Sequence, residues 1–130
     1  MWVLDTNTLI YFFKGEGRVA KRILERAPRD IGIPSVVLYE LQVGIAKSSS
    51  PQKRAGQLEE LISVVPVLAF DRREAKAAAE VRATLESEGQ PIGSYDTLIA
   101  GTALAHGSIL VTRNTREFER IKRLRLEDWF

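Results

Sequence analysis

The sequence predicts an α/β fold with three layers, in which a mostly parallel central sheet is flanked by helices. Short apolar runs that are typical of buried parallel strands alternate with longer segments of helical periodicity. Residues that begin or end helices lie at the junctions between these segments. The chain has 130 residues, of which 45% are hydrophobic, enough for one sizeable core. We therefore expect residues 1–130 to form a single domain.

The first half of the chain is expected to contain two strands and four helices. In chain order these are a strand at 2–4, helices at 6–14 and 17–27, a strand at 31–33, and helices at 36–47 and 52–63. Ser35 is expected to cap the helix that follows it, and Pro51 suits the start of the last helix in this half.

The second half is expected to contain two strands and two long helices. In chain order these are a strand at 67–70, an Ala-rich helix at 72–88, an apolar helix at 95–106 and a strand at 109–111. Asp71 and Ser94 are expected to cap the two helices, and Gly89 and Gly107 to end them. A basic helical turn and a short segment at 124–126 follow. Parallel sheets of this kind bind ligands beyond the carboxyl ends of their strands.

The composition narrows the kinds of site that this fold can carry. The absence of cysteine excludes disulfides, thiolate metal sites and a cysteine nucleophile, and it favours the cytoplasmic location that we expect. His106 is the only histidine and closes a helix, so any metal must be held by oxygen ligands. The net charge of +2 requires any nucleic-acid contact to be local, and no apolar run reaches the length of a membrane span.

Two acids, Asp5 and Glu40, lie at positions where an ordinary surface acid is not expected. Asp5 directly follows the first strand and begins the turn into a helix, so it is either a helix cap or a site residue at the edge of the sheet. Glu40 lies on an apolar helical stripe with Val36, Val37 and Val43. A carboxylate buried there requires a cation or a partner, and the alternative is a position at the stripe edge from which Glu40 reaches water.

Two further acids lie near later helix starts. Asp96 is in the first turn of its helix, where the helix dipole favours an anion, yet its neighbours Ile99 and Ala100 are apolar. Glu117 follows the last predicted strand and is either a site residue or a solvated charge, and Asn114 just before it is suited to cap the short turn.

The four acids together predict a metal site. Carboxylates that converge on one crevice repel one another and stay ionised only around cations. Carboxylate ligands that leave positions for water suit Mg²⁺ or Mn²⁺ beside a phosphate. We therefore expect one or two such ions to be held for phosphodiester hydrolysis by Asp5, Glu40, Asp96 and Glu117.

Several segments also resemble motifs of one family. Three segments resemble PIN-domain motifs: Val3-Leu4-Asp5-Thr6-Asn7, Leu38-Tyr39-Glu40-Leu41, and Pro91 to Ala100. Two further segments resemble the VapC branch of that family, namely Leu110 to Arg120 and Leu126 to Trp129. The matches keep their order over nearly the whole chain. The resemblance implies a PIN-like fold and a metal-dependent endoribonuclease, the toxin of a type II toxin–antitoxin pair that inhibits translation until its antitoxin neutralises it.

The resemblance also implies roles and partners. The family acids that match Asp5, Glu40 and Asp96 hold the metal, while Asn114 and Glu117 occupy the nearer and farther candidate positions for the fourth ligand. It implies a VapB-type antitoxin whose C-terminal segment crosses the active-site groove, and a homodimer within a toxin–antitoxin hetero-oligomer. The implied substrate is RNA, with tRNA as the candidate, and no membrane is involved.

Other polar residues are expected to support the site. The carboxylates or their waters are expected to be oriented by Thr6, Asn7, Thr112 and Asn114, although caps and turns explain these residues equally well. Arg113 and Arg116 begin a basic tail and are expected to hold RNA phosphates. The alternatives for this tail are a solvated basic turn and a surface that receives an acidic antitoxin segment.

Two other classes of protein share part of this pattern. Phosphotransferases with an aspartyl nucleophile also begin with an acid after the first strand, but they have Asp-x-Asp where this chain has Asp5-Thr6-Asn7. A PIN-like module that only binds RNA or protein would gain nothing from clustered acids. The helical segments at 36–45 and 98–105 have more apolar residues than one face requires, which indicates core or a dimer surface.

Overall fold

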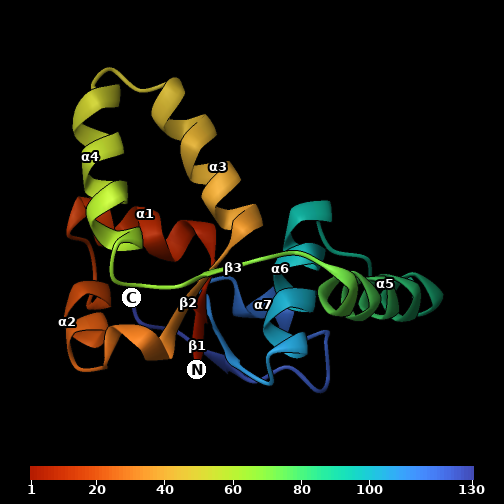
Figure 1. The fold of residues 1–130 in the computed structure, drawn as a ribbon. Helices are drawn as coiled ribbons and strands as arrows, with labels where there is room; N and C mark the ends of the chain where they lie inside the picture. Colours follow the sequence, from red (N-terminus) through yellow and green to blue (C-terminus); the bar gives the residue numbers. More distant parts are fainter.

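The fold alternates strands and helices along the whole chain. The computed structural model describes residues 1–130, and Figure 1 shows its elements in chain order. They are β1 (Trp2–Leu4), α1 (Thr6–Lys14), α2 (Val19–Leu24), a 3₁₀ turn (Pro28–Asp30), β2 (Ile31–Pro34), α3 (Ser35–Ala46), α4 (Pro51–Ile62), β3 (Val67–Leu68), α5 (Arg72–Ser87), α6 (Ser94–Ala105), β4 (Ile109–Val111), α7 (Thr115–Phe118) and β5 (Leu126–Glu127).

The five strands form one parallel sheet in the order β3-β2-β1-β4-β5. The first strand is central, so the chain builds outward on one side of β1 and then on the other. The predicted parallel α/β fold is confirmed. The strand β4 was predicted. The region of β5 was expected only as a short segment at 124–126. It pairs with β4 at Leu110 and Leu126, and two residues are too few to show strand periodicity in a sequence.

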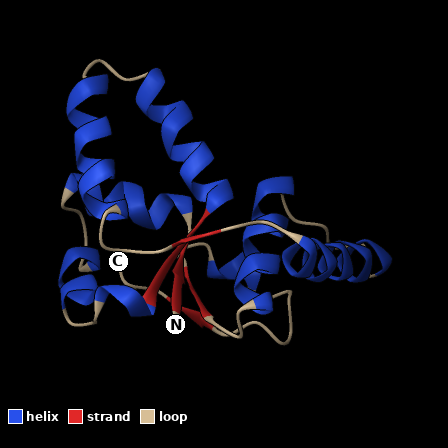
Figure 2. Ribbon diagram, in the orientation of Figure 1, coloured by secondary structure: helices blue, strands red, loops and turns tan.

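Helices cover both faces of the sheet (Figure 2). The helices α1 and α2 lie on one side and α5 and α6 on the other, while α3 and α4 project as a pair beyond the sheet (Figure 1). One continuous cluster of 24 buried apolar side chains fills the interior, and it includes the large side chains of Trp129, Phe118 and Leu4. No helix combines the length and apolarity that a membrane crossing requires.

The two helices α5 and α6 pack at very short range. A Cβ atom added to Gly101 would lie 2.5 Å from the Cβ of Ala78 and 2.6 Å from its Cα. The small side chains at this crossing therefore set the separation of the two helices. The start of α5 carries the predicted cap, since the Asp71 carboxylate accepts a hydrogen bond from the backbone and the Asp71 amide donates to the Glu74 carboxylate at 2.9 Å.

Several expected boundaries were wrong. Ser35 and Ser94 do not cap their helices; they are the first helical residues, and Pro34 and Gly93 precede them without a side-chain hydrogen bond. In the first case β2 runs into α3 without an intervening loop, so no residue is left between strand and helix. The helix expected at 17–27 covers only Val19–Leu24, and Gly17 has a φ of +65° that helical residues do not adopt.

Candidate active site

The site lies where the strand order reverses. The neighbouring central strands β1 and β4 are parallel, so the residues that follow them emerge at the same edge of the sheet. Asp5 follows β1, and the segment from Thr112 to Glu117 follows β4. This edge of a parallel sheet, at a reversal of strand order, is the usual position for a ligand site.

Asp5 is held rigidly at this edge. The residue is only 5% exposed, and its carboxylate caps α1 by accepting a hydrogen bond from the Thr8 amide at 2.9 Å. Burial raises the pKa of Asp5, and hydrogen bonds from Thr112 and Thr8 counteract this rise. Asp5 therefore does cap the helix, and the same contacts fix its carboxylate beside the end of β4.

Asp96 provides the evidence that the four predicted acids meet. It is half-buried in the first turn of α6, and its pKa is raised to about 6. Burial is the largest cause, followed by the negative charges of Asp5, Glu117 and Glu40 in that order. These three acids belong to three other parts of the chain, the end of β1, the helix α7 and the helix α3. The structure thus brings all four carboxylates into one electrostatic cluster.

Glu40 reaches the cluster from α3 with one neutral partner. The Thr6 hydroxyl donates to Glu40 Oε1 at 2.7 Å, which joins α3 to the first residue of α1. Of the two alternatives for Glu40, the structure shows the position at the edge of the stripe, because Glu40 is only partly buried and Val43 on the same stripe is 37% exposed. The helix α3 projects from the sheet, so part of its apolar surface has no covering layer.

Glu117 and Asn114 lie together. Asn114 Nδ2 donates to Glu117 Oε2 at 3.2 Å, and the Asn114 amide donates to the Thr112 hydroxyl at 3.0 Å. Asn114 precedes α7, but its side chain does not cap that helix. The side-chain amide of Asn114 instead orients Glu117. Asn7, which was expected to orient a carboxylate, is exposed and makes no hydrogen bond to any of the acids.

The donor set suits a hard divalent cation. The four carboxylates supply only oxygen ligands, and the repulsion that raises the Asp96 pKa is relieved by a positive charge among them. No three Asp, Glu or His side chains are already arranged around one point as a ligand set. Binding of a cation would therefore require side-chain rotation within a cluster whose backbone positions are already fixed.

The two arginines predicted to bind RNA differ in their surroundings. Both are exposed, and Arg116 makes no ion pair. The guanidinium carbon of Arg113 lies 3.6 Å from the ring centre of Phe130 and 5.7 Å from that of Tyr11. This stacking directs Arg113 along the aromatic surface beside α1.

One acid near the site was missed by the sequence analysis. Asp128 lies close enough for its charge to raise the pKa of Asp5 further. It directly follows β5, so it emerges at the same sheet edge as the residues after β1 and β4. The signal that would have revealed it is β5 itself, whose two residues were not recognised as a strand.

The raised pKa of Asp96 predicts a pH dependence of stability. Between the ordinary value of 3.8 and about 6, the folded protein retains a proton that the unfolded chain has released. The free energy of unfolding should therefore fall as the pH rises through this window, and it should fall less in Asp96→Asn. Thermal denaturation of both proteins in EDTA tests this difference, and parallel curves would contradict the assigned pKa.

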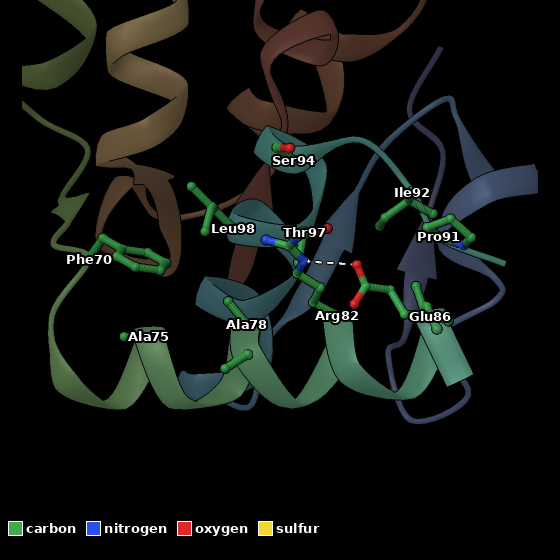
Figure 3. A pocket seen from close by; sticks show the side chains of 12 residues that line it. Phe70, Ala75, Ala78, Arg82, Glu86, Pro91, Ile92, Ser94, Thr97 and Leu98 are labelled. Carbon is green, nitrogen blue, oxygen red and sulfur yellow. Dashed lines mark hydrogen bonds and ion pairs between the residues drawn. The ribbon is translucent and has the colours of Figure 1, made fainter. Parts of the chain in front are cut away.

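Two other features of the structure lie apart from the acids. A groove of about 520 Å³ runs between α5 and α6 and is lined mainly by apolar side chains such as Phe70, Ile92 and Leu98 (Figure 3). Its charged groups, Arg82 and Glu86, neutralise each other at 3.0 Å. None of the four clustered acids lines this groove.

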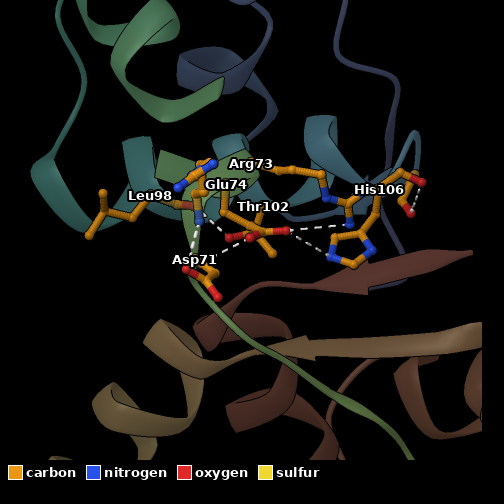
Figure 4. Close-up of polar contacts among 8 residues, drawn as sticks. Asp71, Arg73, Glu74, Leu98, Thr102 and His106 are labelled. Atoms are coloured by element: carbon orange, nitrogen blue, oxygen red, sulfur yellow. Dashed lines mark hydrogen bonds and ion pairs between the residues drawn. The ribbon is translucent and has the colours of Figure 1, made fainter. Parts of the chain in front are cut away.

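His106 has a structural environment. Its Nε2 lies 3.4 Å from Glu74 Oε2, and Glu74 also faces Arg73 at 3.7 Å (Figure 4). The hydrogen bond from the Asp71 backbone is the main reason that the pKa of Glu74 is lowered. These contacts join the start of α5 to the end of α6.

The comparison with known families identifies the family of this chain. The PIN domain family matches residues 2–124. The chain belongs to the PIN-domain family.

Several relatives place it more closely. The "tRNA(fMet)-specific endonuclease VapC" of Shigella flexneri is 38% identical over 128 residues, which cover 98% of this chain and 97% of the relative. "Ribonuclease VapC2" of Haemophilus influenzae is 35% identical over 131 residues, covering 98% and 97%. The structure of VapBC2 from Rickettsia felis, bound to a DNA fragment from their promoter, matches with a TM-score of 0.92 and 34% identity over 99% of this chain and 98% of that one. Within the PIN-domain family, the chain falls in the VapC branch.

Proposed function

We propose that this protein is a metal-dependent endoribonuclease and the toxin of a VapBC-type toxin–antitoxin pair, carried by one domain of residues 1–130. The observation that carries the proposal is the convergence of Asp5, Glu40 and Glu117 on Asp96, whose pKa their charges help to raise to about 6. Oxygen-rich clusters of this kind suit Mg²⁺ or Mn²⁺, as one ion or two, beside a phosphate. Relatives that are named as ribonucleases or as a tRNA-specific endonuclease support RNA as the substrate.

Each side chain of the cluster has a role in this proposal. The four carboxylates provide the ligands, the Thr6 hydroxyl orients Glu40, and the Asn114 amide orients Glu117. The Thr112 hydroxyl favours the ionised form of Asp5, since it lowers the pKa of that carboxylate. Since the pKa of Asp96 is about 6, this group is largely ionised at neutral pH and ready to bind a cation. When bound, the cation acidifies the attacking water and neutralises charge on the scissile phosphodiester.

The substrate backbone requires positive charge outside this acidic cluster. Arg113 and Arg116 follow β4 at the same edge of the sheet and are exposed. We assign them to the RNA phosphates on either side of the cut, where they offset the repulsion between the carboxylates and the RNA. The preferred substrate class is tRNA, in line with the name of the Shigella flexneri relative.

The partner that we propose is a VapB-type antitoxin. Solved structures similar to this chain are complexes named VapBC, including a DNA-bound one from Salmonella typhimurium at 39% identity and a TM-score of 0.92 over 99% of this chain and 98% of that one. In the assembly that we propose, two copies of this chain form a homodimer and each binds one antitoxin. The toxin acts in the cytoplasm, where its RNA substrates are found.

Metal-dependent cleavage of RNA tests the proposed function directly. Purified protein with Mn²⁺ should cleave total tRNA at discrete positions, because the four carboxylates can then act around a cation. Excess EDTA should stop cleavage, and addition of Mg²⁺ or Mn²⁺ should restore it. Gel separation and sequencing of the RNA ends provide the measurement. Folded protein that leaves tRNA intact with each divalent ion, or cleavage that persists in EDTA, would contradict the proposal.

A further inference from the structure

Two exposed tyrosines stand beside the acid cluster. Tyr39 precedes Glu40 on α3, and Tyr95 precedes Asp96 on α6. Their ring centres are 5.7 Å apart with an angle of 60° between the ring planes, and their hydroxyl oxygens are 3.4 Å apart. The pair therefore bridges two helices that each contribute one acid to the cluster.

The exposure of this pair is exceptional in the molecule. Tyr39 is 51% exposed and Tyr95 is 45% exposed, while every other Phe, Tyr and Trp is buried or half-buried. A half-exposed ring forgoes part of the free energy that its burial would provide. The rings contact each other edge to face, so they leave apolar ring surface open to solvent next to the cluster. An apolar surface of this kind is suited to a ligand.

The chemistry of the cluster indicates which ligand fits. Four carboxylates repel the phosphate backbone of RNA, so a contact with a group that carries no charge adds binding free energy that this repulsion does not reduce. Nucleobases are the uncharged part of RNA, and unpaired bases stack on exposed tyrosine rings. A nucleotide whose phosphate lies among the acids has its base within reach of residues adjacent to those acids.

We propose that Tyr39 and Tyr95 form a nucleobase-binding subsite that stacks an unpaired base next to the scissile phosphate. This inference rests on the proposed nuclease function and adds a substrate preference to it, for single-stranded RNA over duplex. The tyrosines are binding residues, and the ring of each provides the contact. The hydroxyl pair holds the rings in their relative orientation.

Binding to an oligoadenylate of about ten nucleotides tests the subsite. The comparison oligomer is abasic, with the same sugar–phosphate backbone and charge, and EDTA keeps the RNA intact. Fluorescence anisotropy should show roughly tenfold tighter binding of the oligoadenylate by the unaltered protein, the effect of stacking one base. Tyr39→Ala with Tyr95→Ala should remove this preference, whereas Tyr39→Phe with Tyr95→Phe should keep it.

The controls separate stacking from other causes. Val43→Ala alters another exposed apolar residue of α3 and should leave the preference unchanged. An unaltered protein that binds both oligomers equally, or alanine variants that keep the preference, would overturn the subsite. Light scattering that shows a change of oligomeric mass in the alanine variants would instead assign the pair to a contact between copies of the chain, and would also overturn it. If the protein keeps the base preference but cleaves no RNA, the proposed nuclease function is contradicted and the subsite is not.

Discussion

Asp5→Asn is expected to abolish RNA cleavage while leaving the protein folded. Asparagine caps a helix as well as aspartate does, so the hydrogen bond from the Thr8 amide can be retained. The substitution removes a carboxylate from the proposed ligand set. Altering a residue that only orients metal ligands lowers metal affinity or activity about 10- to 100-fold. Loss of a direct ligand should therefore lower kcat/KM by more than about 100-fold. Steady-state cleavage of tRNA with Mn²⁺ measures the loss.

Asp71→Asn is the matched control for this substitution. Asp71 also caps a helix, but it is not among the charges that raise the pKa of Asp5 or Asp96. The Asp71→Asn protein should cleave tRNA as fast as the unaltered protein does. In EDTA, Asp5→Asn should have an equal or higher Tm than the unaltered protein, because the neutral amide removes a buried charge whose pKa is raised. Full activity of Asp5→Asn would exclude Asp5 from the metal site.

Gly101→Ala is expected to destabilise the fold substantially. The added methyl group would meet the Ala78 backbone at 2.6 Å, and a backbone cannot move aside as a flexible side chain can. The helices α5 and α6 must separate, so the free energy of unfolding should fall by about 1–3 kcal/mol. Urea denaturation followed by circular dichroism measures this change.

Gly56→Ala is the control for Gly101→Ala. Gly56 also lies inside a helix, α4, but it is exposed, and beyond its chain neighbours and its own helix backbone nothing lies within 4 Å of an added Cβ. Alanine has the higher helix propensity, so this substitution should raise the free energy of unfolding by about 0.5–1 kcal/mol. Opposite signs for the two variants are the expected result, and a Gly101→Ala protein as stable as Gly56→Ala would contradict the close packing of α5 on α6.

Local chemistry predicted most of the elements. The cap at Asp71 and the glycines that end the long helices, Gly89 and Gly107, act within one helical turn of their own positions. The serine caps at Ser35 and Ser94 were wrong because the preceding chain decides where a helix can begin. The boundary between strand and helix thus depends on contacts that the capping preference alone does not include.

The burial of individual residues was less predictable than their identity. The apolar surplus of α6 is core, with Ile99 and Ala100 buried, whereas the similar surplus of α3 is partly exposed at Tyr39 and Val43. The two helices have the same kind of sequence. They differ because α6 is covered by α5 and the sheet, while α3 projects beyond the sheet (Figure 1). Which helix has a covering layer is decided by the packing of distant segments.

The sequence by itself determined the parallel α/β class and the four acids, Asp5, Glu40, Asp96 and Glu117, as the candidate site. Short-range periodicity, capping chemistry and the family resemblance were sufficient for that. Only the tertiary structure decided the strand order, the convergence of those acids, the nearness of Asp128 to Asp5, and the pairing of Tyr39 with Tyr95. The physical reason is that these contacts join residues far apart in the chain, and their distances are set by how the helices pack on the sheet.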